Sequence, residues 1–487
     1  MAKVRTVYST QDDGAGTLRD ALRVTASYTS EWIDAGALEN GDIIDFSDEL
    51  EEDGVITILL SSQIDLPAKI LTIDGGGHAG NGETLQTRVV LDAQQVGRHL
   101  RLTASSPNGV SVKDLTLCNG LVSGDGGVLT AVSSNINAFE FCVFKDNNAN
   151  SAGAAFLSGT SQTIFSNCLF DNCQSTSSGG GIYTYSSTNN TFSFCSFRDC
   201  TATNSGGAFC TTQTSETLIE NCLFNHCSAN SGGALYATNT SKATLTNCSF
   251  VPPANNEKIT LYNNSTNTDV SLIINGATAC DHVWFSANTK TVINGKLTAD
   301  VLTITTGASV TFSGVDSILA ATTTASIGSA SFTAAADSTG YLALPYGTTP
   351  PTVGTGVKTC IYGANIESAS VSATVVSWTA ETLSTPILIE QLSRDNWNTL
   401  TDAATGGTYS GTFGEGVTVR LFDGVNFYYT SRPAPYWLVN SFAVNASNGW
   451  IVDASAVATN GGGGTDPVSG DPLPYWTITT DDITPNF

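Results

Sequence analysis

The sequence predicts an all-β protein built as a parallel β-helix, a solenoid with about 26–27 residues in each coil. Two features of the middle of the chain indicate this fold: a cysteine that recurs once in every such interval, and a phenylalanine at the second position after each cysteine. The cysteines are Cys142, Cys168, Cys195, Cys222 and Cys248, and the phenylalanines are Phe144, Phe170, Phe197, Phe224 and Phe250. One such unit cannot bury its own apolar face, whereas stacked units share a continuous core.

The composition argues against several classes of partner. The 487 residues include 43 Asp and Glu but only 19 Lys and Arg, which gives a net charge of −24 at pH 7. A surface for nucleic acid or anionic lipid needs clustered basic residues, so we expect neither partner. No apolar stretch is long enough for a membrane span, and no signal peptide is visible at the start of the chain.

The spacing of the repeat also predicts where each coil bends. A second apolar column lies five positions before the phenylalanines; it comprises Phe139, Phe165, Phe192, Ile219 and Leu245, and Val112 and Leu117 extend the two columns upstream. Successive side chains of a strand face opposite sides, so columns an odd number of positions apart need a bend between them. The predicted corner is the Asn-Cys step, at Asn167, Asn221 and Asn247. Glycine pairs such as Gly206–Gly207 predict a second corner, where the backbone needs positive φ or close approach.

Residues 1–50 are predicted to form an N-terminal helical cap, and residues 51–255 the regular β-helix. Residues 17–24 have the pattern of a short amphipathic helix, with Thr17 as N-cap and Asp20 at the third position after it. The terminal coils of a solenoid need such a cap because an open end exposes unpaired strand edges.

Several phrases in the first half of the chain resemble bacterial surface proteins. GGAF, GGAL and FKDN (residues 144–147) are similar to the GGA[ILV] and FxxN repeats of chlamydial polymorphic membrane proteins, and GAGTLRDAL is similar to the start of other repeat-bearing surface proteins. The resemblance covers about residues 8–255 and implies a right-handed β-helix displayed outside a bacterial cell. The chain departs from the family in one column, because the Asn of FxxN is kept at Asn147 and replaced by Cys173, Cys200 and Cys227.

The period is lost after residue 255. Residues 256–350 keep short alternating runs and are predicted to continue the β-helix irregularly, while residues 351–460 are predicted to form a separate C-terminal β-domain. Residues 461–487 begin with four glycines and are predicted to be a linker and an assembly tail. The candidate assembly residues are Tyr475, Trp476, Ile478, Ile483 and Phe487. They pack either against the C-terminal domain or as a strand added to a neighbouring subunit.

The sequence lacks the motifs of β-helix enzymes. Galacturonan hydrolases of this fold use a Gly-His-Gly turn and a basic R-x-K, and the chain contains neither. Lyases need a carboxylate cluster for Ca²⁺ and a base, and no column of the repeats holds an acidic triplet. Cys222, His226 and Cys227 have zinc-ligating chemistry, but if the two cysteines belong to inward columns, a zinc site would have to form inside a packed core, which favours a packing role. We therefore predict no catalytic residue, no metal and no cofactor.

These observations favour a non-enzymatic structural or adhesive protein, extracellular or on the surface of a bacterial cell. Its stalk would attach or self-assemble into a homo-oligomer or filament through the C-terminal part, and its ligand would be a surface glycan or a protein. Two alternatives stay open: a phage virion spike or fibre protein, and a β-helix polysaccharide lyase or hydrolase. The cysteines are predicted to be mostly free and buried, because stacked Cβ vectors disfavour the disulfide dihedral.

Overall fold

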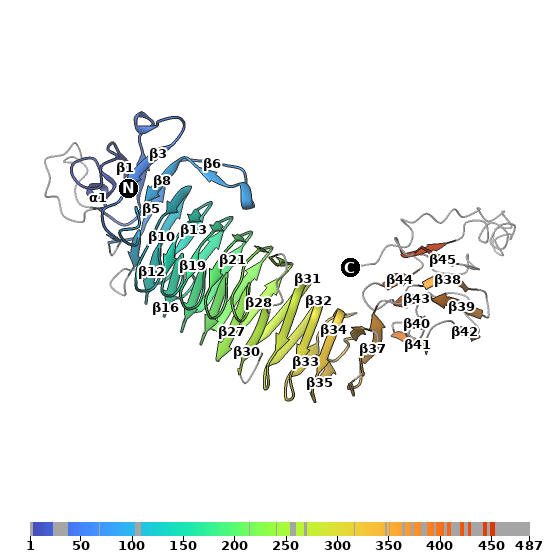
Figure 1. The fold of residues 1–487 in the computed structure, drawn as a ribbon. Helices are drawn as coiled ribbons and strands as arrows, with labels where there is room; N and C mark the ends of the chain where they lie inside the picture. Colours follow the sequence, from blue (N-terminus) through green and yellow to red (C-terminus); the bar gives the residue numbers. More distant parts are fainter. Residues whose placement is uncertain are drawn as a thin grey trace, which may run out of the picture. The chain divides into compact units, whose positions relative to one another are not determined.

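The computed structural model describes most of the chain up to residue 362 and the strands beyond it (Figure 1). The described residues are 3–22, 38–67, 69–102, 109–213, 215–239, 241–253, 260–266, 270–315, 317–345, 348–349, 351–362 and the strands between residues 366 and 452. The chain falls into two compact units, one of residues 1–314 and 326–335 and the other of residues 315–325 and 336–487.

The first unit is a parallel β-helix, as predicted, and its strands form three columns. Sheet A comprises β1 (Val4–Val7), β2 (Asp42–Phe46), β5 (Leu71–Asp74), β10 (Val110–Lys113), β13 (Ala138–Glu140), β17 (Ile164–Ser166), β21 (Thr188–Ser193), β25 (Ser215–Glu220), β28 (Ala243–Thr246), β33 (Ser309–Phe312) and β35 (Ser331–Ala334). Sheet B comprises β3 (Ile56–Leu59), β8 (Val89–Asp92), β11 (Leu115–Cys118), β14 (Val143–Lys145), β18 (Leu169–Asp171), β22 (Ser196–Arg198), β26 (Leu223–Asn225) and β29 (Ser249–Val251). Sheet C comprises β4 (Ile64–Asp65), β9 (Leu100–Leu102), β12 (Leu129–Val132), β16 (Ala155–Ser158), β20 (Ile182–Tyr185), β24 (Phe209–Thr212), β27 (Leu235–Asn239) and β30 (Leu261–Ser265). A short extra column holds β15 (Asn148–Ala149), β19 (Gln174–Ser175) and β23 (Thr201–Ala202).

The two predicted apolar columns are confirmed, and both fill the inside of the solenoid. In the first column the rings of Phe144, Phe170, Phe197, Phe224 and Phe250 stack in series, with centroid distances of 4.5–4.9 Å and interplanar angles of 4–6°. In the second column Phe139 pairs with Val112 on one side and with Phe165 on the other. All these rings are buried, so each coil contributes apolar surface to a core that it shares with both neighbours.

Both predicted corners are present. Asn167, Asn221 and Asn247 adopt φ angles of 51–53°, the left-handed region that asparagine tolerates better than other non-glycine residues. At the glycine corner Gly206 has a φ of 64°, and a Cβ atom on Gly207 would lie 2.2 Å from the carbonyl oxygen of Gly233. Glycine is therefore required at Gly207 by the close approach of the next coil, and at Gly206 it relieves the strain of the left-handed turn.

The inward cysteines form two buried ladders. Each thiol of the ladder that starts at Cys142 donates to a carbonyl oxygen of the preceding coil at 3.4–3.5 Å. In the second ladder Cys173 donates to the carbonyl oxygen of Phe144 at 3.2 Å, and Asn147, one coil earlier, donates its amide to Leu117 at 3.0 Å. The thiol thus replaces the amide as donor in the coils where Cys173 stands in the column of Asn147. None of the cysteines that the structure describes forms a disulfide.

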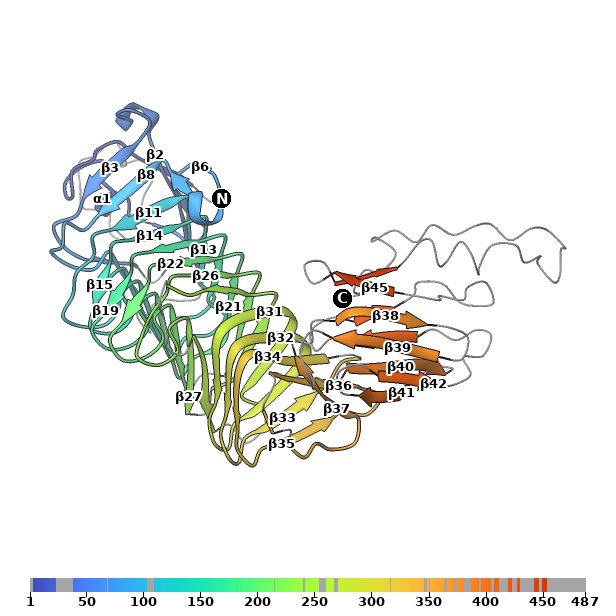
Figure 2. The same cartoon turned by 45° about the vertical axis from the view of Figure 1, so that its right-hand side comes forward.

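The coils shorten beyond the regular region. Phe139 pairs with Phe165, a full repeat later in the chain, whereas Ile274 pairs with Ile293 after a shorter interval of the chain. The reason is that β31 (Leu272–Phe285) and β32 (Lys290–Ile304) run as long curved strands through positions where earlier coils have separate strands and corners (Figure 2). At the first bend of β31, Gly276 has a φ of 63°, in the left-handed region that favours glycine, and a Cβ atom there would lie 1.9 Å from Oδ1 of Asn247.

The N-terminal segment carries the predicted helix start. α1 (Leu18–Ala21) begins after Thr17, whose hydroxyl accepts a hydrogen bond from the backbone N–H of Asp20. Leu18 and Ala21 are buried, and η2 (Asp48–Leu50) follows β2. The predicted continuation of this helix to residue 24 lies outside the described residues. Within the described part of the chain, no helix has the length and hydropathy that crossing a membrane requires.

The second unit contains parallel and antiparallel strands. The first four residues of β34 (Ser317–Ile327) pair in parallel with β36 (Gly340–Pro345), and β36 pairs in parallel with β37 (Val357–Tyr362). Within this unit antiparallel pairing begins at β38, so the pairing mode of the unit changes near residue 366. One antiparallel sheet comprises β38 (Ile366–Val371), β39 (Val375–Ala380), β42 (Gly407–Ser410), β45 (Phe442–Asn445) and β46 (Gly449–Val452). The other comprises β40 (Ile387–Ser393), β41 (Asn396–Ala403), β43 (Val419–Phe422) and β44 (Phe427–Tyr429). The domain boundaries predicted from sequence stay predictions.

Candidate functional site

The outer face of sheet C carries aromatic side chains on successive coils, which we call the aromatic stripe. It comprises Phe156, Tyr183, Tyr236, Tyr262 and Trp284. Strand geometry places them outside the core: in β20, Ile182 and Thr184 are buried, whereas Tyr183 between them is partly exposed. The stripe therefore runs along the solenoid on one face, partly exposed at each position.

The stripe has two segments in edge-to-face or tilted contact. The ring centroids of Phe156 and Tyr183 lie 5.5 Å apart, and those of Tyr236 and Tyr262 lie 5.2 Å apart. Trp284 continues the second segment at 5.5 Å from Tyr262. Cys210 occupies the register position between the segments and is buried. Such aromatic surface, partly in water and arranged in a row, has the character of a binding platform.

Polar groups along the stripe are only partly used within the protein. The hydroxyl of Tyr236 accepts a hydrogen bond from Asn264, and that of Tyr262 accepts one from Ser286, both at 3.1 Å. Each hydroxyl keeps its own hydrogen for donation. Nε1 of Trp284 is buried and, among the described residues, has no hydrogen-bond partner. Burial raises the pKa of Tyr183, so this phenol stays a protonated donor at neutral pH.

None of these aromatic residues was predicted as a site residue, although the sequence contains a signal for them. In the phrases GGGIY and GGALY, the tyrosine follows an aliphatic residue that points inward from the start of the sheet C strand. Period-two alternation therefore places the tyrosine outward. The repeat hid this column because its members vary in type, from Phe156 through Cys210 to Trp284.

The outer face of sheet A contains a hollow of about 340 Å³ over three coils. β21, β25 and β28 supply its walls, and its lining residues are Asn189, Asn190, Thr191, Glu216, Thr217, Leu218, Lys242 and Thr244. Nζ of Lys242 lies 3.1 Å from Oε1 of Glu216. The hollow therefore combines an ion pair, hydroxyl and amide groups, and one aliphatic side chain.

Part of the outer face of sheet B is covered by residues 75–88, which we call the arm. The arm contains β6 (His78–Ala79), η3 (Gly82–Thr84) and β7 (Gln86–Thr87). The ring of His78 stacks on Phe141 at 3.9 Å, and its Nδ1 lies 2.6 Å from Oδ1 of Asp114. Leu85 packs with Val143 and Leu169. The arm thus buries apolar side chains that this sheet would otherwise expose.

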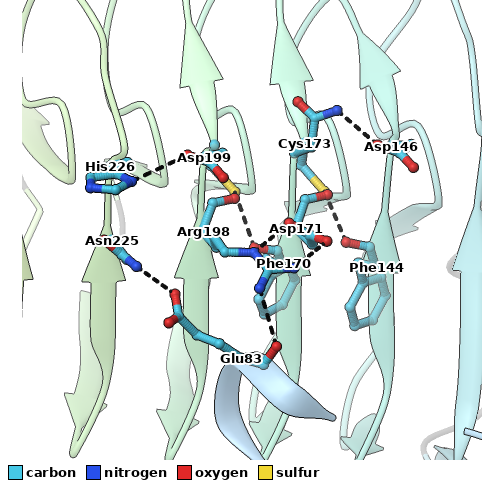
Figure 3. Close-up of polar contacts among 12 residues, drawn as sticks. Glu83, Phe144, Asp146, Phe170, Asp171, Cys173, Arg198, Asp199, Asn225 and His226 are labelled. Atoms are coloured by element: carbon cyan, nitrogen blue, oxygen red, sulfur yellow. Dashed lines mark hydrogen bonds and ion pairs between the residues drawn. The ribbon is translucent and has the colours of Figure 1, made fainter. Parts of the chain in front are cut away.

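A polar network fastens the far end of the arm (Figure 3). Arg198 donates to both carboxylate oxygens of Asp171, at 2.8 and 2.7 Å, and to the carbonyl oxygen of Glu83 at 3.2 Å. Asn225, one coil further, donates to the Glu83 carboxylate at 2.7 Å. The bidentate bond to Asp171 raises the pKa of Arg198. Arg198 therefore serves to hold the arm, and its guanidinium is engaged in the free protein.

The cysteines and the histidine that sequence suggested as zinc ligands do not converge. Cys222 and Cys227 belong to two different buried ladders, which agrees with a packing role. His226 lies at an outer corner, with Nδ1 3.6 Å from Oδ1 of Asp199 (Figure 3). The predicted assembly residues Tyr475, Trp476, Ile478, Ile483 and Phe487 lie outside the described residues.

Two carboxylates lie side by side near the end of the stripe. Cys280 pairs with Ala299 and His282 pairs with Val301, which places Asp281 beside Asp300 on neighbouring coils. Burial and the neighbouring Asp300 raise the pKa of Asp281. Such a pair retains a proton more readily than an isolated aspartate does.

The comparisons with known proteins agree with the fold. A family model described as a right-handed beta helix region matches residues 126–297. The chain is a right-handed β-helix repeat protein. Similarity of this β-helix protein to the chlamydial polymorphic membrane proteins stays a prediction, and no curated protein matches its sequence significantly.

Several solved structures are similar to the β-helix protein at low sequence identity. An alginate lyase from Paenibacillus sp. is 13% identical over 74% of this chain and 98% of its own, with a TM-score of 0.35. The ORF18 protein of Geobacillus virus E2 is 12% identical over 98% of this chain and 86% of its own, with a TM-score of 0.34. A tailspike protein of E. coli bacteriophage HK620 is 10% identical over 79% of this chain and 80% of its own, with a TM-score of 0.26.

Proposed function

We propose that the protein is a non-enzymatic adhesive protein of the bacterial exterior that binds an extended glycan along the aromatic stripe. The observation that carries the proposal is the row formed by Tyr236, Tyr262 and Trp284 on consecutive coils. A pyranose ring has an apolar C–H face that packs on aromatic rings, while its hydroxyls bond to phenol and amide groups at the ring edges.

The spacing of the stripe supports a glycan that runs along the solenoid. Consecutive coils are separated by the strand spacing of a sheet, about 4.8 Å, which is close to the length of one pyranose residue in an extended chain. Successive sugars would then meet successive coils with the same geometry. The break at Cys210 divides the stripe into two stretches. The second stretch has three consecutive rings, those of Tyr236, Tyr262 and Trp284, and a short glycan can bind along it without reaching the first stretch.

The charge of the protein favours neutral glycans over acidic ones. The net charge of −24 creates a negative potential that repels polyanions and slows their association. Basic residues are sparse in the regular repeats, and Arg198 is already engaged by Asp171. We therefore expect neutral or weakly charged polysaccharides as ligands, with any binding of acidic ones strengthened by salt.

A glycan array followed by calorimetry tests the proposal. The double variant Tyr236→Ala/Tyr262→Ala should lose affinity for the best array ligand on the order of tenfold or more, since each aromatic contact contributes about 0.5–1.5 kcal/mol. Tyr185→Ala is the matched control: this tyrosine is also on sheet C and exposed, but it lies outside the stripe. The proposal fails if no glycan binds at millimolar concentration, or if the double variant binds as well as the unaltered protein.

A hydrolytic function is the second candidate, favoured by Asp281 and Asp300 near the end of the stripe. Neighbouring strands are about 4.8 Å apart, and retaining glycosidases hold their two carboxyl groups about 5–5.5 Å apart. Incubating the array ligand with the protein and measuring its chain length distinguishes the two functions. Shortening that leaves no unsaturated sugar end and is lost in Asp281→Asn would establish hydrolysis, and unchanged chain length would leave adhesion.

Assembly through the tail is part of the same proposal. An adhesive protein gains avidity when several copies present their binding faces together, because later contacts become intramolecular. The tail residues from Tyr475 to Phe487 are apolar and rich in β-forming types, which suits a strand added to a neighbouring subunit.

A further inference from the structure

The hollow on sheet A differs in chemistry from the stripe. It lies between side chains of β21, β25 and β28, and its volume of about 340 Å³ is near the lower end of the range of small-ligand sites. A volume of this size suits one or two sugar rings. The stripe, in contrast, is a row of aromatic faces along the outer surface of sheet C.

Three side chains give the hollow its chemical character. Glu216 offers a carboxylate acceptor and Lys242 an ammonium donor, joined at 3.1 Å and both partly exposed. A carboxylate has two oxygens and an ammonium has three hydrogens, so their ion pair leaves groups on both for a ligand. Leu218, two residues after Glu216, pairs with Thr191 on one side and with Thr244 on the other, and it supplies an aliphatic contact.

We propose that this hollow binds a 2-acetamido sugar. An acetamido group carries an N–H donor, a carbonyl acceptor and a methyl group on one rigid plane. Lys242 can donate to the carbonyl, and Leu218 can cover the methyl group. The N–H of a trans amide points away from its carbonyl, so a hydroxyl of Thr191 or Thr244 can accept from it, while Glu216 accepts from a hydroxyl of the sugar ring.

Other sugars fit these groups less well. A uronic acid would place its carboxylate against Glu216 in a protein of charge −24. A hexose with a hydroxyl at the same carbon offers no methyl group for Leu218. The inference rests on the proposed function, because the ligand of the hollow and the ligand of the stripe are both glycans. It adds that the polysaccharide bound by the protein contains N-acetylated sugar residues.

The test compares two disaccharides of the same linkage by calorimetry on the full chain. N,N′-diacetylchitobiose should bind, and cellobiose, with hydroxyls in place of both acetamido groups, should bind at least about tenfold more weakly. Glu216→Gln keeps the size of the side chain but removes its charge, and Leu218→Ser removes the aliphatic contact. Each should weaken chitobiose binding about tenfold or more, with circular dichroism confirming that both variants are folded.

The stripe variant Tyr236→Ala separates this inference from the proposed function. Chitobiose binding by Tyr236→Ala should equal that of the unaltered protein, because Tyr236 is not among the residues lining the hollow. Any of three results would overturn the inference. The first is equal affinity for the two disaccharides, and the second is no binding of chitobiose at 10 mM, about the weakest affinity that calorimetry detects. The third is unchanged chitobiose binding by Glu216→Gln and Leu218→Ser. Loss of chitobiose binding in Tyr236→Ala alone would also overturn it, while leaving glycan binding by the stripe intact.

Discussion

Truncation of one ring in the phenylalanine column, Phe197→Ala, should destabilise its own coil and the two that flank it. Phe197 is buried and stacks on Phe170 at 4.5 Å and on Phe224 at 4.9 Å. Removing the ring loses about 2 kcal/mol of transfer free energy and two ring contacts of about 0.5–1.5 kcal/mol each. The total, about 3–5 kcal/mol, equals the usual cost of Phe→Ala in a core.

Native-state hydrogen exchange with mass spectrometry measures this loss coil by coil. A destabilisation of about 3–5 kcal/mol should speed exchange by roughly two to nearly four orders of magnitude in β22, and also in β18 and β26, where Phe197 has its ring partners. Coils further away should change little, because the stability of a solenoid depends on contacts between neighbouring repeats.

Phe194 provides the matched control within the same coil. Its side chain is 56% exposed and its φ angle is +53°. Phe194→Asn should therefore leave exchange unchanged or slower, since asparagine suits the left-handed corner. Equal exchange in Phe197→Ala and Phe194→Asn would refute the assigned register, and uniform acceleration along the whole solenoid would refute the local character of the loss.

Four further predictions concern titration, oxidation and assembly. Burial lowers the pKa of His99 to about 4, so His99 of the unfolded state is protonated at a higher pH than His99 of the folded state. The free energy of unfolding should therefore fall by about 3 kcal/mol as pH drops from 6.5 to 4. Urea titrations should show this loss, and a flatter dependence of stability on pH for His99→Gln. Burial and the neighbouring Asp300 raise the pKa of Asp281, so the contribution of the protonated Asp281 to stability is present at low pH and is lost as pH rises through the raised pKa. Asp281→Asn should therefore raise the melting temperature at pH 7 and leave it unchanged at pH 3. Thiol titration in denaturant without reductant should find most of the twelve cysteines free, and five or six disulfides would contradict the ladders. Light scattering should give a larger mass for the full chain than for a chain ending at Gly464, and equal masses at all concentrations would exclude assembly through the tail.

The regular coils could be predicted because their spacing is periodic. The phenylalanine column follows from the constant interval of the repeat, and the corner at Asn167 follows from the odd separation of two apolar columns. The shortened coils could not be predicted in the same way. Their length depends on β31 and β32 running on through bends where earlier coils have separate corner residues, and no repeated residue marks that change.

The sites were harder to predict than the fold. The stripe escapes a search for repeats because Cys210 interrupts it and its last two aromatic residues, Tyr262 and Trp284, lie where the period changes. The hollow depends on Glu216 and Lys242 meeting across two coils, 26 residues apart in the chain. The contact between Glu83 and Asn225 spans 142 residues, and nothing in the local sequence of either residue indicates the other.

The corner between sheets A and B shows how this chain can change in length. One coil turns that corner with Asp114 alone, and the coil before it inserts the whole arm of residues 75–88 between the same two strands. Insertions are therefore accommodated at corners, where they leave the strand register intact. Within the strands, Leu169 and Ser196 are equivalent positions on adjacent coils, so duplication or deletion preserves inward and outward faces only when it adds or removes a whole coil. Gene duplication of single coils would thus lengthen the solenoid, and with it the aromatic stripe, without disturbing either end.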